Sequence, residues 1–242
     1  MRKSIFSFVA AAAVMSGAAS ATTVVETFDA LGLGEGDAVN TFSFGTVSTV
    51  ANAPGEDQAI IFDTNDDTNG DGDLRGLFTR VTGVDGSGDL ILGENNVDLG
   101  NVLIISEGAA SSPAPDDNRN GGVITLTFNE AVTFIGFDAI DTGEDALTVT
   151  LLGADGMELG SIVADLDLDQ NDNVGTDGDP LTQNFFASFI AAGGGIAGVV
   201  TAVFDFGTNS GAIDNIVFQT AEIPVPGAIP LLISGIAGLR LA

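Results

Sequence analysis

Apolar and polar residues alternate along much of this 242-residue chain with a period of two, the pattern of a half-buried β-strand. In VITLTF (123–128), Ile124, Leu126 and Phe128 share one face of the expected strand, and LTVTLL (147–152) alternates similarly. TFSFGTVSTV (41–50) also alternates but changes phase near Gly45. Further strand candidates are 58–62, 101–106, 132–140, 199–206 and 212–218.

Turns rich in glycine, aspartate and asparagine separate these runs, at 83–89, 116–122, 141–145, 153–156 and 208–211. About ten to twelve short strands at such spacing predict an all-β fold, an antiparallel β-sandwich that is jelly-roll-like. A helix is an alternative only for 185–192. There, a Phe-Phe pair and the three glycines at 193–195 favour a strand followed by a loop equally well.

The first 21 residues have the three parts of a secretory signal peptide. Arg2 and Lys3 form a basic start, 5–15 is mostly apolar, and Ala19 and Ala21 frame a small-residue cleavage site. We expect a signal helix that is removed on export; the alternative is a buried N-terminal helix.

Charge is distributed very unevenly. All 34 acidic residues lie between Thr22 and Glu222, and the only basic residues there are Arg75, Arg80 and Arg119. Such a surface repels nucleic acid and anionic lipid, and its self-repulsion is relieved by salt or by bound cations. A hydrophobic fraction of 45% argues against a disordered acidic chain and for a folded domain.

Several residue types are absent, and their absence restricts the chemistry. The chain has no cysteine and no histidine, which excludes thiol nucleophiles, zinc–thiolate sites and a Ser-His-Asp triad. It also lacks tryptophan and tyrosine, the usual stacking platforms for sugars. We therefore expect a protein that is not an enzyme, with a carboxylate-based glycan hydrolase as the remaining catalytic alternative.

The densest acidic stretch is DTNDDTNGDGDLRG (63–76). Its oxygen-bearing side chains alternate as in a calcium-binding loop and resemble the first part of an EF-hand or dockerin-type loop; they are Asp67, Asn69, Asp71 and Asp73. Phe78 stands at the twelfth position, where such loops carry an acid, so oxygens from elsewhere would have to complete the site. The alternative is a solvated acidic turn.

A second acidic stretch, 165–179, places Asp165, Asp167 and Asp169 on one face of an extended segment. Like charges this close are unfavourable unless a cation binds or water solvates them fully. The stretch is therefore either a metal site or a strand edge whose carboxylates are solvated by water.

The two ends of the domain carry a third candidate. VVETFDA (24–30) and SGAIDNIVF (210–218) are expected to form neighbouring strands, and the second resembles the last strand of calcium-containing carbohydrate-binding β-sandwiches. By this resemblance Glu26 and Asp214 share a structural calcium, with Asp29 a weaker candidate. The alternative is that Asp214 and Asn215 make turn or edge hydrogen bonds.

The last residues, IPVPGAIPLLISGIAGLRLA (223–242), combine a proline motif, an apolar stretch and a basic residue. They resemble the PEP-CTERM-type sorting signal with a VPLPA-like motif, with Pro224, Val225, Pro226 and Gly227 as the motif and Arg240 at the basic end. The family usually ends in several basic residues, whereas Leu241 and Ala242 follow here. The resemblance implies a short hydrophobic helix, transient anchoring in the inner membrane, cleavage by an exosortase-like membrane protease, and release to the cell surface or outside. A C-terminal segment packed on the domain is the alternative.

Together these features divide the chain into a signal peptide (1–21), an acidic β-sandwich domain (22–221) and a sorting segment (222–242). The expected function is that of a non-enzymatic exported surface or extracellular-matrix protein, stabilised by calcium and in contact with extracellular polysaccharide. A carbohydrate-binding module is the alternative.

Overall fold

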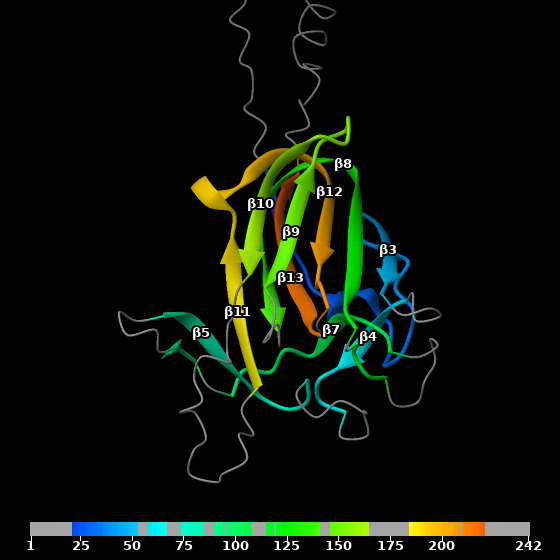
Figure 1. Ribbon diagram of the computed structural model, residues 1–242, viewed down its shortest axis with the longest axis vertical. Helices are drawn as coiled ribbons and strands as arrows, with labels where there is room; N and C mark the ends of the chain where they lie inside the picture. The colour runs from blue at the N-terminus through cyan, green and yellow to red at the C-terminus, as the bar shows by residue number, and fades with distance from the viewer. Residues whose placement is uncertain are drawn as a thin grey trace, which may run out of the picture. The chain divides into compact units, whose positions relative to one another are not determined.

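The computed structural model describes residues 21–52, 58–66, 74–84, 90–94, 96–107, 115–118, 120–140, 146–164, 184–208 and 210–220. These residues form thirteen β-strands and two short 3-10 helices (Figure 1). The strands are β1 (Thr23–Glu26), β2 (Thr41–Phe42), β3 (Gly45–Ala51), β4 (Ala59–Asp63), β5 (Phe78–Val84), β6 (Leu90–Leu92), β7 (Asn101–Ile105), β8 (Gly122–Ile140), β9 (Leu147–Leu152), β10 (Glu158–Ala164), β11 (Asn184–Ile190), β12 (Ile196–Asp205) and β13 (Ala212–Thr220). The helices are η1 (Phe28–Leu31) and η3 (Ala192–Gly194). The prediction of an all-β domain is confirmed.

Strand β8 is the centre of the fold. It joins the two predicted strands 123–128 and 132–140 into one strand of 19 residues. Its alternation of buried and partly buried positions is interrupted at the exposed residues 129–131. The part before this interruption pairs with β3 and β12, and the part after it pairs with β11, β13 and the start of β12. A single strand thus connects most of the others.

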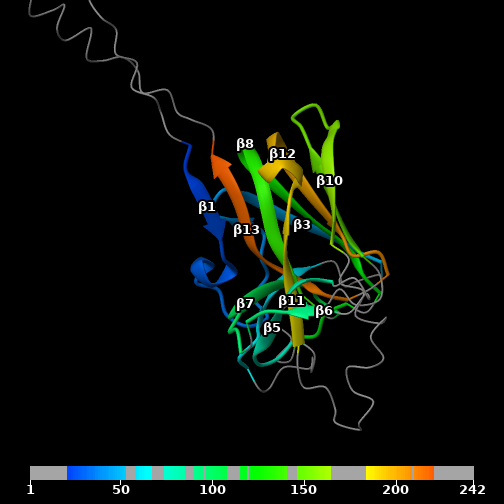
Figure 2. The same ribbon diagram turned by 90° about the vertical axis from the view of Figure 1, so that its left-hand side faces the viewer.

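The strands follow the order β10-β9-β12-β8-β11-β5-β6, and β13 branches from β8 to reach β1 and β7. Figure 2 shows β1 and β13 on one side of β8 and β10 on the other. All pairs are antiparallel except β11 with β5, which are parallel. The expectation of a wholly antiparallel arrangement is therefore wrong for this pair. A long connection separates β5 from β11 in the chain, and parallel pairing requires such a connection.

Two local predictions can be compared directly with the strands. The phase change near Gly45 marks the turn between β2 and β3, which pair through Thr41 with Thr46 and Phe42 with Gly45. The ambiguous segment 185–192 forms strand β11 up to Ile190 rather than an α-helix, and its last residue, Ala192, begins η3. In η3, Gly193 and Gly194 have φ values of 74° and 85°, a left-handed conformation that favours glycine.

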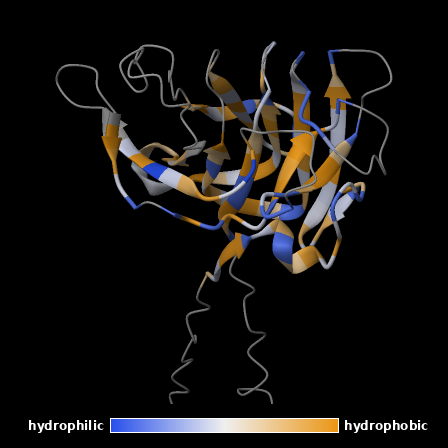
Figure 3. Ribbon diagram, turned by 90° about the horizontal axis from the view of Figure 1, so that it is seen from below, coloured by the Kyte–Doolittle hydropathy of each residue, from blue (hydrophilic) through white to orange (hydrophobic). Residues whose placement is uncertain are grey.

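The apolar side chains form two clusters. The larger is centred on phenylalanines: the ring centroids of Phe137 and Phe204 are 5.1 Å apart, and those of Phe128 and Phe218 are also 5.1 Å apart. The smaller cluster contains Ile60, Phe62, Leu74, Phe78, Leu99, Val102, Ile104, Ile140, Phe186 and Ala212. Figure 3 shows hydrophobic residues alternating with others along many strands.

Strands β4 and β7 contribute to both clusters, since successive side chains point to opposite faces of a strand. Ile61 and Leu103 belong to the larger cluster, whereas Ile60 and Ile104 belong to the smaller one. Burial on both faces explains why these two strands are continuous apolar runs in the sequence.

The first and last strands are neighbours, as predicted. β1 pairs antiparallel with β13, and the Thr220 amide donates to the Thr22 carbonyl at 3.1 Å. Thr22–Ala221 form one compact unit. Within the part of the chain that the structure describes, no helix is long and apolar enough to span a membrane. The predicted signal peptide, except Ala21, and the predicted sorting segment lie outside the described residues.

Candidate functional site

Strand β13 contains a bulge next to its acidic residue. The pairing with β8 shifts register between Asp214 and Val217, and Asn215 has a φ of 49°. Before the bulge, Ala212 faces the smaller apolar cluster; after it, Ile216 faces the larger one. The extra residue of the bulge lies at Asn215 and Ile216, which together stand opposite Phe137. Asp214 directly precedes the bulge and keeps its own partner on β8.

The partner residue is Asp138 of β8, which pairs directly with Asp214. Both acids are buried, with exposed fractions of 6% for Asp138 and 2% for Asp214. The Asn215 side-chain amide donates to Oδ2 of Asp138 at 2.9 Å. Among the described residues, no donor reaches Oδ1 of Asp214. A buried carboxyl oxygen without a partner is costly, and this one lies beside a second carboxylate.

Burial changes the ionisation of Asp214. Its pKa is raised from 3.8 to about 8, first because burial disfavours the charged form and also because Asp138 and Asp29 are negatively charged neighbours. The backbone N–H groups of Asn215 and Phe28 act in the opposite direction. At neutral pH this carboxyl group therefore either keeps its proton or requires a positive partner.

Asp29, from η1, is the third acid near this pair. It is exposed, and its Oδ1 accepts a hydrogen bond from the Asn101 amide at 2.8 Å. A side chain at residue 100 would collide with it, because a Cβ added to Gly100 would lie 2.6 Å from Oδ1 of Asp29. Gly100 has a φ of 63°, so glycine is favoured there for its backbone conformation as well.

Glu26, which was predicted to share a calcium ion with Asp214, has a hydrogen-bond partner of its own away from Asp214. It is buried and lies opposite Ile216, beyond the bulge. Its Oε1 accepts a hydrogen bond from the Ser43 hydroxyl at 3.0 Å. The structure thus places Glu26 on the adjacent strand but surrounds Asp214 with Asp138, Asn215 and Asp29. Asp138 was missed in the sequence, although it is the only charged residue in the apolar run 132–140.

A second group of acids lies at the end of β4. Oε2 of Glu35 accepts a hydrogen bond from the Asp63 amide, and Oε1 of Glu35 has no partner among the described residues. The pKa of Glu35 is raised from 4.5 to about 7, mainly by burial and then by the charges of Asp63 and Asp66. Nearby, the Asn65 side-chain amide donates to Oδ1 of Asp98 at 2.8 Å.

This second group adjoins the predicted calcium loop. Asp66 immediately precedes the loop residues Asp67, Asn69, Asp71 and Asp73, which lie outside the described residues. Glu35 is about 30 positions away in sequence and was not predicted. Its carboxylate is a candidate ligand from a distant part of the sequence, which is what the incomplete loop pattern requires. The acids Asp165, Asp167 and Asp169 also lie outside the described residues.

The oxygen-only chemistry of the Asp214 group matches a hard cation such as calcium better than zinc. The group supplies two buried carboxylates and one carboxamide, and one carboxylate oxygen is unpartnered. In the described part of the chain, no three acids are placed closely enough to hold a metal ion by themselves. A calcium ion at Asp214 would therefore need backbone or water oxygens to complete its six to eight ligands.

No protein-family model matches the chain, and no curated protein matches it either.

Proposed function

We propose that this protein is a non-enzymatic, exported β-domain of the cell surface or extracellular matrix, stabilised by calcium. The observation that supports it best is the buried Asp138–Asp214 pair with an unpartnered oxygen, in a domain that carries 34 acids and almost no bases. An extracellular setting supplies the divalent cations that such a surface needs.

In this proposal, Asp214 and Asp138 hold the ion, and Asn215 orients Asp138 through its side-chain hydrogen bond. Bound calcium supplies the positive charge that two buried carboxylates lack. It would fix β13 to β8 and, through Asp29, η1 to the start of β7. Glu35 and Asp66 are the described residues that would complete a second site with the loop 67–73.

The remaining parts of the proposal rest on sequence resemblance. Residues 1–21 direct export, and 222–242 are a PEP-CTERM-type sorting segment that an exosortase-like membrane protease recognises at Pro224, Val225, Pro226 and Gly227. Transient anchoring ends with cleavage and release. The β-strands would form a jelly-roll-like sandwich, an assignment supported by the pairing of β8 with different sets of strands before and after residues 129–131. Exposed acids with bound cations would contact acidic polysaccharide.

Thermal unfolding at fixed high ionic strength, with calcium or with chelator, tests the proposal. Calcium at about 100 times its dissociation constant should add about 2.7 kcal/mol per site, which raises Tm by several degrees. Magnesium should not reproduce this increase. Identical melting curves with calcium and chelator would contradict calcium stabilisation.

Matched variants separate the two candidate sites. Asp214→Asn removes a charge at the β13 bulge, and Asp67→Asn removes one from the predicted loop. Loss of the calcium response only in Asp214→Asn assigns it to the buried pair. Loss only in Asp67→Asn assigns it to the loop and removes the ion from the buried pair.

The sorting part requires a separate experiment in an exosortase-containing Gram-negative host. The natural chain should appear outside the cell without its tail, and Pro226→Ala should stay with the membrane fraction. Equal release of both proteins would contradict the assignment of the sorting motif.

A further inference from the structure

One end of the domain exposes apolar side chains on neighbouring elements. Met157, Leu159 and Ile190 have exposed fractions of 67%, 43% and 66%. Leu159 lies beside the segment 192–198, which contains only alanine, glycine and isoleucine, and Ile190 lies two positions before this segment in the chain. We call these residues the apolar end. Contiguous exposed apolar surface of this kind marks an interaction site more often than isolated exposed residues do.

Close contacts connect the elements of the apolar end. An added Cβ on Gly198 would lie 3.7 Å from the Leu159 side chain, and one on Gly160 would lie 2.6 Å from the Ile196 side chain. On the β11–β12 side the chain is free of charge, since residues 180–204 contain no acidic or basic residue, in a protein with 34 acids. On the hairpin side, Glu158 lies between Met157 and Leu159, so the apolar end combines an uncharged half with an acidic edge.

Strand pairing places the apolar end next to the point where the chain enters and leaves the domain. Phe134 of β8 pairs with Ile196 on one side and with Phe218 on the other. Thr220, two residues after Phe218, donates a backbone hydrogen bond to Thr22. In Figures 1 and 2, η3 and the β9–β10 turn lie at the same end as the C-terminal end of β13.

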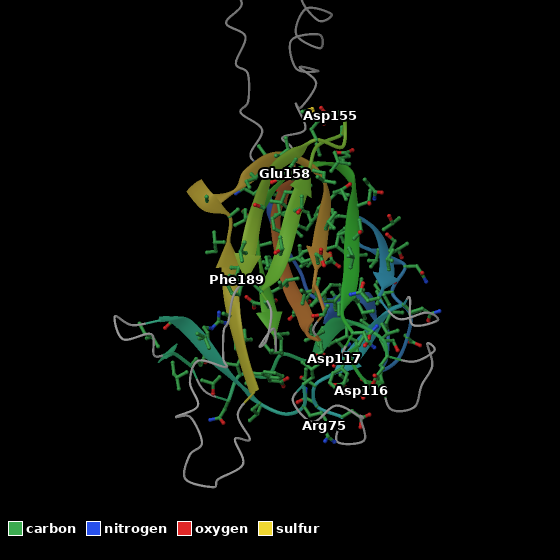
Figure 4. All side chains as sticks on the ribbon, viewed as in Figure 1. Arg75, Asp116, Asp117, Asp155, Glu158 and Phe189 are labelled. Carbon is green, nitrogen blue, oxygen red and sulfur yellow. The ribbon has the colours of Figure 1, made fainter. Side chains whose placement is uncertain are left out.

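The opposite end of the domain carries charged residues, and it also exposes apolar ones: Val50 is 66% and Leu77 48% exposed. Figure 4 shows Arg75, Asp116 and Asp117 at that end, far from Asp155 and Glu158 of the β9–β10 hairpin. Val50 also lies there, because it pairs with Val123, which pairs with Asp205 at the end of β12. β12 runs ten residues from Ile196 to Asp205, about 30 Å at the rise of a β-strand.

The covalent chain limits how far the apolar tail can be from this surface. Gly227, where the apolar run 227–239 of the tail begins, is seven positions after Thr220. Fully extended, this segment spans at most about 25 Å. A membrane that holds the tail must therefore lie close to the end of the domain from which Thr220 emerges.

We propose that the apolar end rests on the lipid surface while the tail is inserted in the membrane. This inference builds on the proposed membrane stage of sorting. Burial of Met157, Leu159 and Ile190 at the lipid interface supplies apolar contact that water cannot. The exposed acids Glu130, Asp155 and Glu158 lie at or near this end, so the surface suits zwitterionic rather than anionic lipid.

The absence of tryptophan and tyrosine provides a direct test. In the full chain, Met157→Trp and Val50→Trp each introduce a single tryptophan at equally exposed positions, 67% and 66%, at opposite ends of the domain. Leu232→Trp introduces one in the tail. The three variants are bound to phosphatidylcholine vesicles with and without brominated acyl chains, which quench nearby tryptophan.

The proposal predicts loss of emission for Met157→Trp and Leu232→Trp and none for Val50→Trp. Quenching of Leu232→Trp alone would overturn the proposal and leave tail insertion intact. Equal quenching of Met157→Trp and Val50→Trp would also overturn it, because the domain would then have no fixed orientation. No quenching at Leu232 would overturn the membrane stage itself. Self-association of the unquenched Met157→Trp protein on vesicles would instead assign the surface to a second copy of the chain.

Discussion

Asp138 and Asp214 are direct cross-strand partners on β8 and β13, and both carboxyl groups are almost completely buried. Like charges at opposed strand positions are unfavourable, and burial increases this cost. The domain can keep this pair only if a proton or a cation reduces the charge. The two possibilities make different predictions about pH and calcium.

The first prediction concerns pH in the presence of chelator. The pKa of Asp214 is raised from 3.8 to about 8, so between these values the folded state binds a proton that the unfolded state has lost. The associated stability is complete below about pH 4 and is lost progressively up to about pH 8, at no more than about 1.4 kcal/mol per pH unit. Asp214→Asn should remove this loss, which denaturant unfolding at several pH values measures.

Glu158→Gln is the matched control, because Glu158 is exposed. Its pH dependence should follow that of the natural protein. If Asp214→Asn and Glu158→Gln gave the same profile, the buried carboxyl group would not be the source of the effect.

The second prediction concerns Glu35, whose pKa is raised from 4.5 to about 7. Stability associated with its protonated form is lost as pH rises from about 4.5 to about 7, a window that ends lower than that of Asp214. Glu35→Gln keeps an oxygen for the Asp63 amide and should remove only this part of the pH dependence. Asp214 still contributes a loss in this range, so only a reduction is expected; an unchanged slope between these pH values in the variant would exclude Glu35 as a contributor.

The third prediction concerns the bulge. Asn215 has a φ of 49° and donates to Asp138. Asn215→Val should cost about 1–2 kcal/mol for the left-handed backbone, and about 1.5–3 kcal/mol more for the lost bond to a carboxylate. Asn215→Gly tolerates the backbone conformation and should lose only the second part. Equal unfolding free energies for the two variants would show that the backbone conformation costs nothing here.

The fourth prediction concerns close backbone contact between β8 and β11. A Cβ at Gly136 would overlap the carbonyl oxygen of Phe189. Gly136→Ala should therefore lower the free energy of unfolding by about 1–3 kcal/mol, as overpacking does elsewhere. Gly34→Ala is the control, since the nearest atom to its added Cβ is 3.7 Å away in a flexible side chain. An unchanged Gly136→Ala protein would mean that the two strands separate easily.

The strands could be predicted from the sequence because alternation is a local property. VITLTF and LTVTLL follow the two-residue period closely, and both are strands in the structure. The continuity of β8 through 129–131 could not be predicted in this way, because Asn129 and Glu130 interrupt the apolar alternation as the residues of a turn would. The parallel pairing of β11 with β5 depends on chain segments about 100 residues apart. No local pattern encodes it.

The candidate site was partly predictable for a similar reason. Asp214 stands out beside Asn215 in an apolar strand, and the pairing of the terminal strands identifies its neighbourhood. The bulge, however, reverses which face each residue of β13 occupies, and this separates Glu26 from Asp214. Because the bulge could not be predicted, the sequence did not distinguish Asp138 from the other acids, apart from its being the sole charge in 132–140.

The pairing of β1 with β13 also constrains when the protein can fold. The first strand of the domain has the last strand as its partner, with paired residues 190 or more positions apart in the chain. Strand β8 likewise pairs with β11, β12 and β13, all of which are synthesised after it. Long-range pairing of this kind makes folding slow. The chain would therefore remain unfolded until it is almost complete, the state in which a polypeptide can be threaded through a translocation channel.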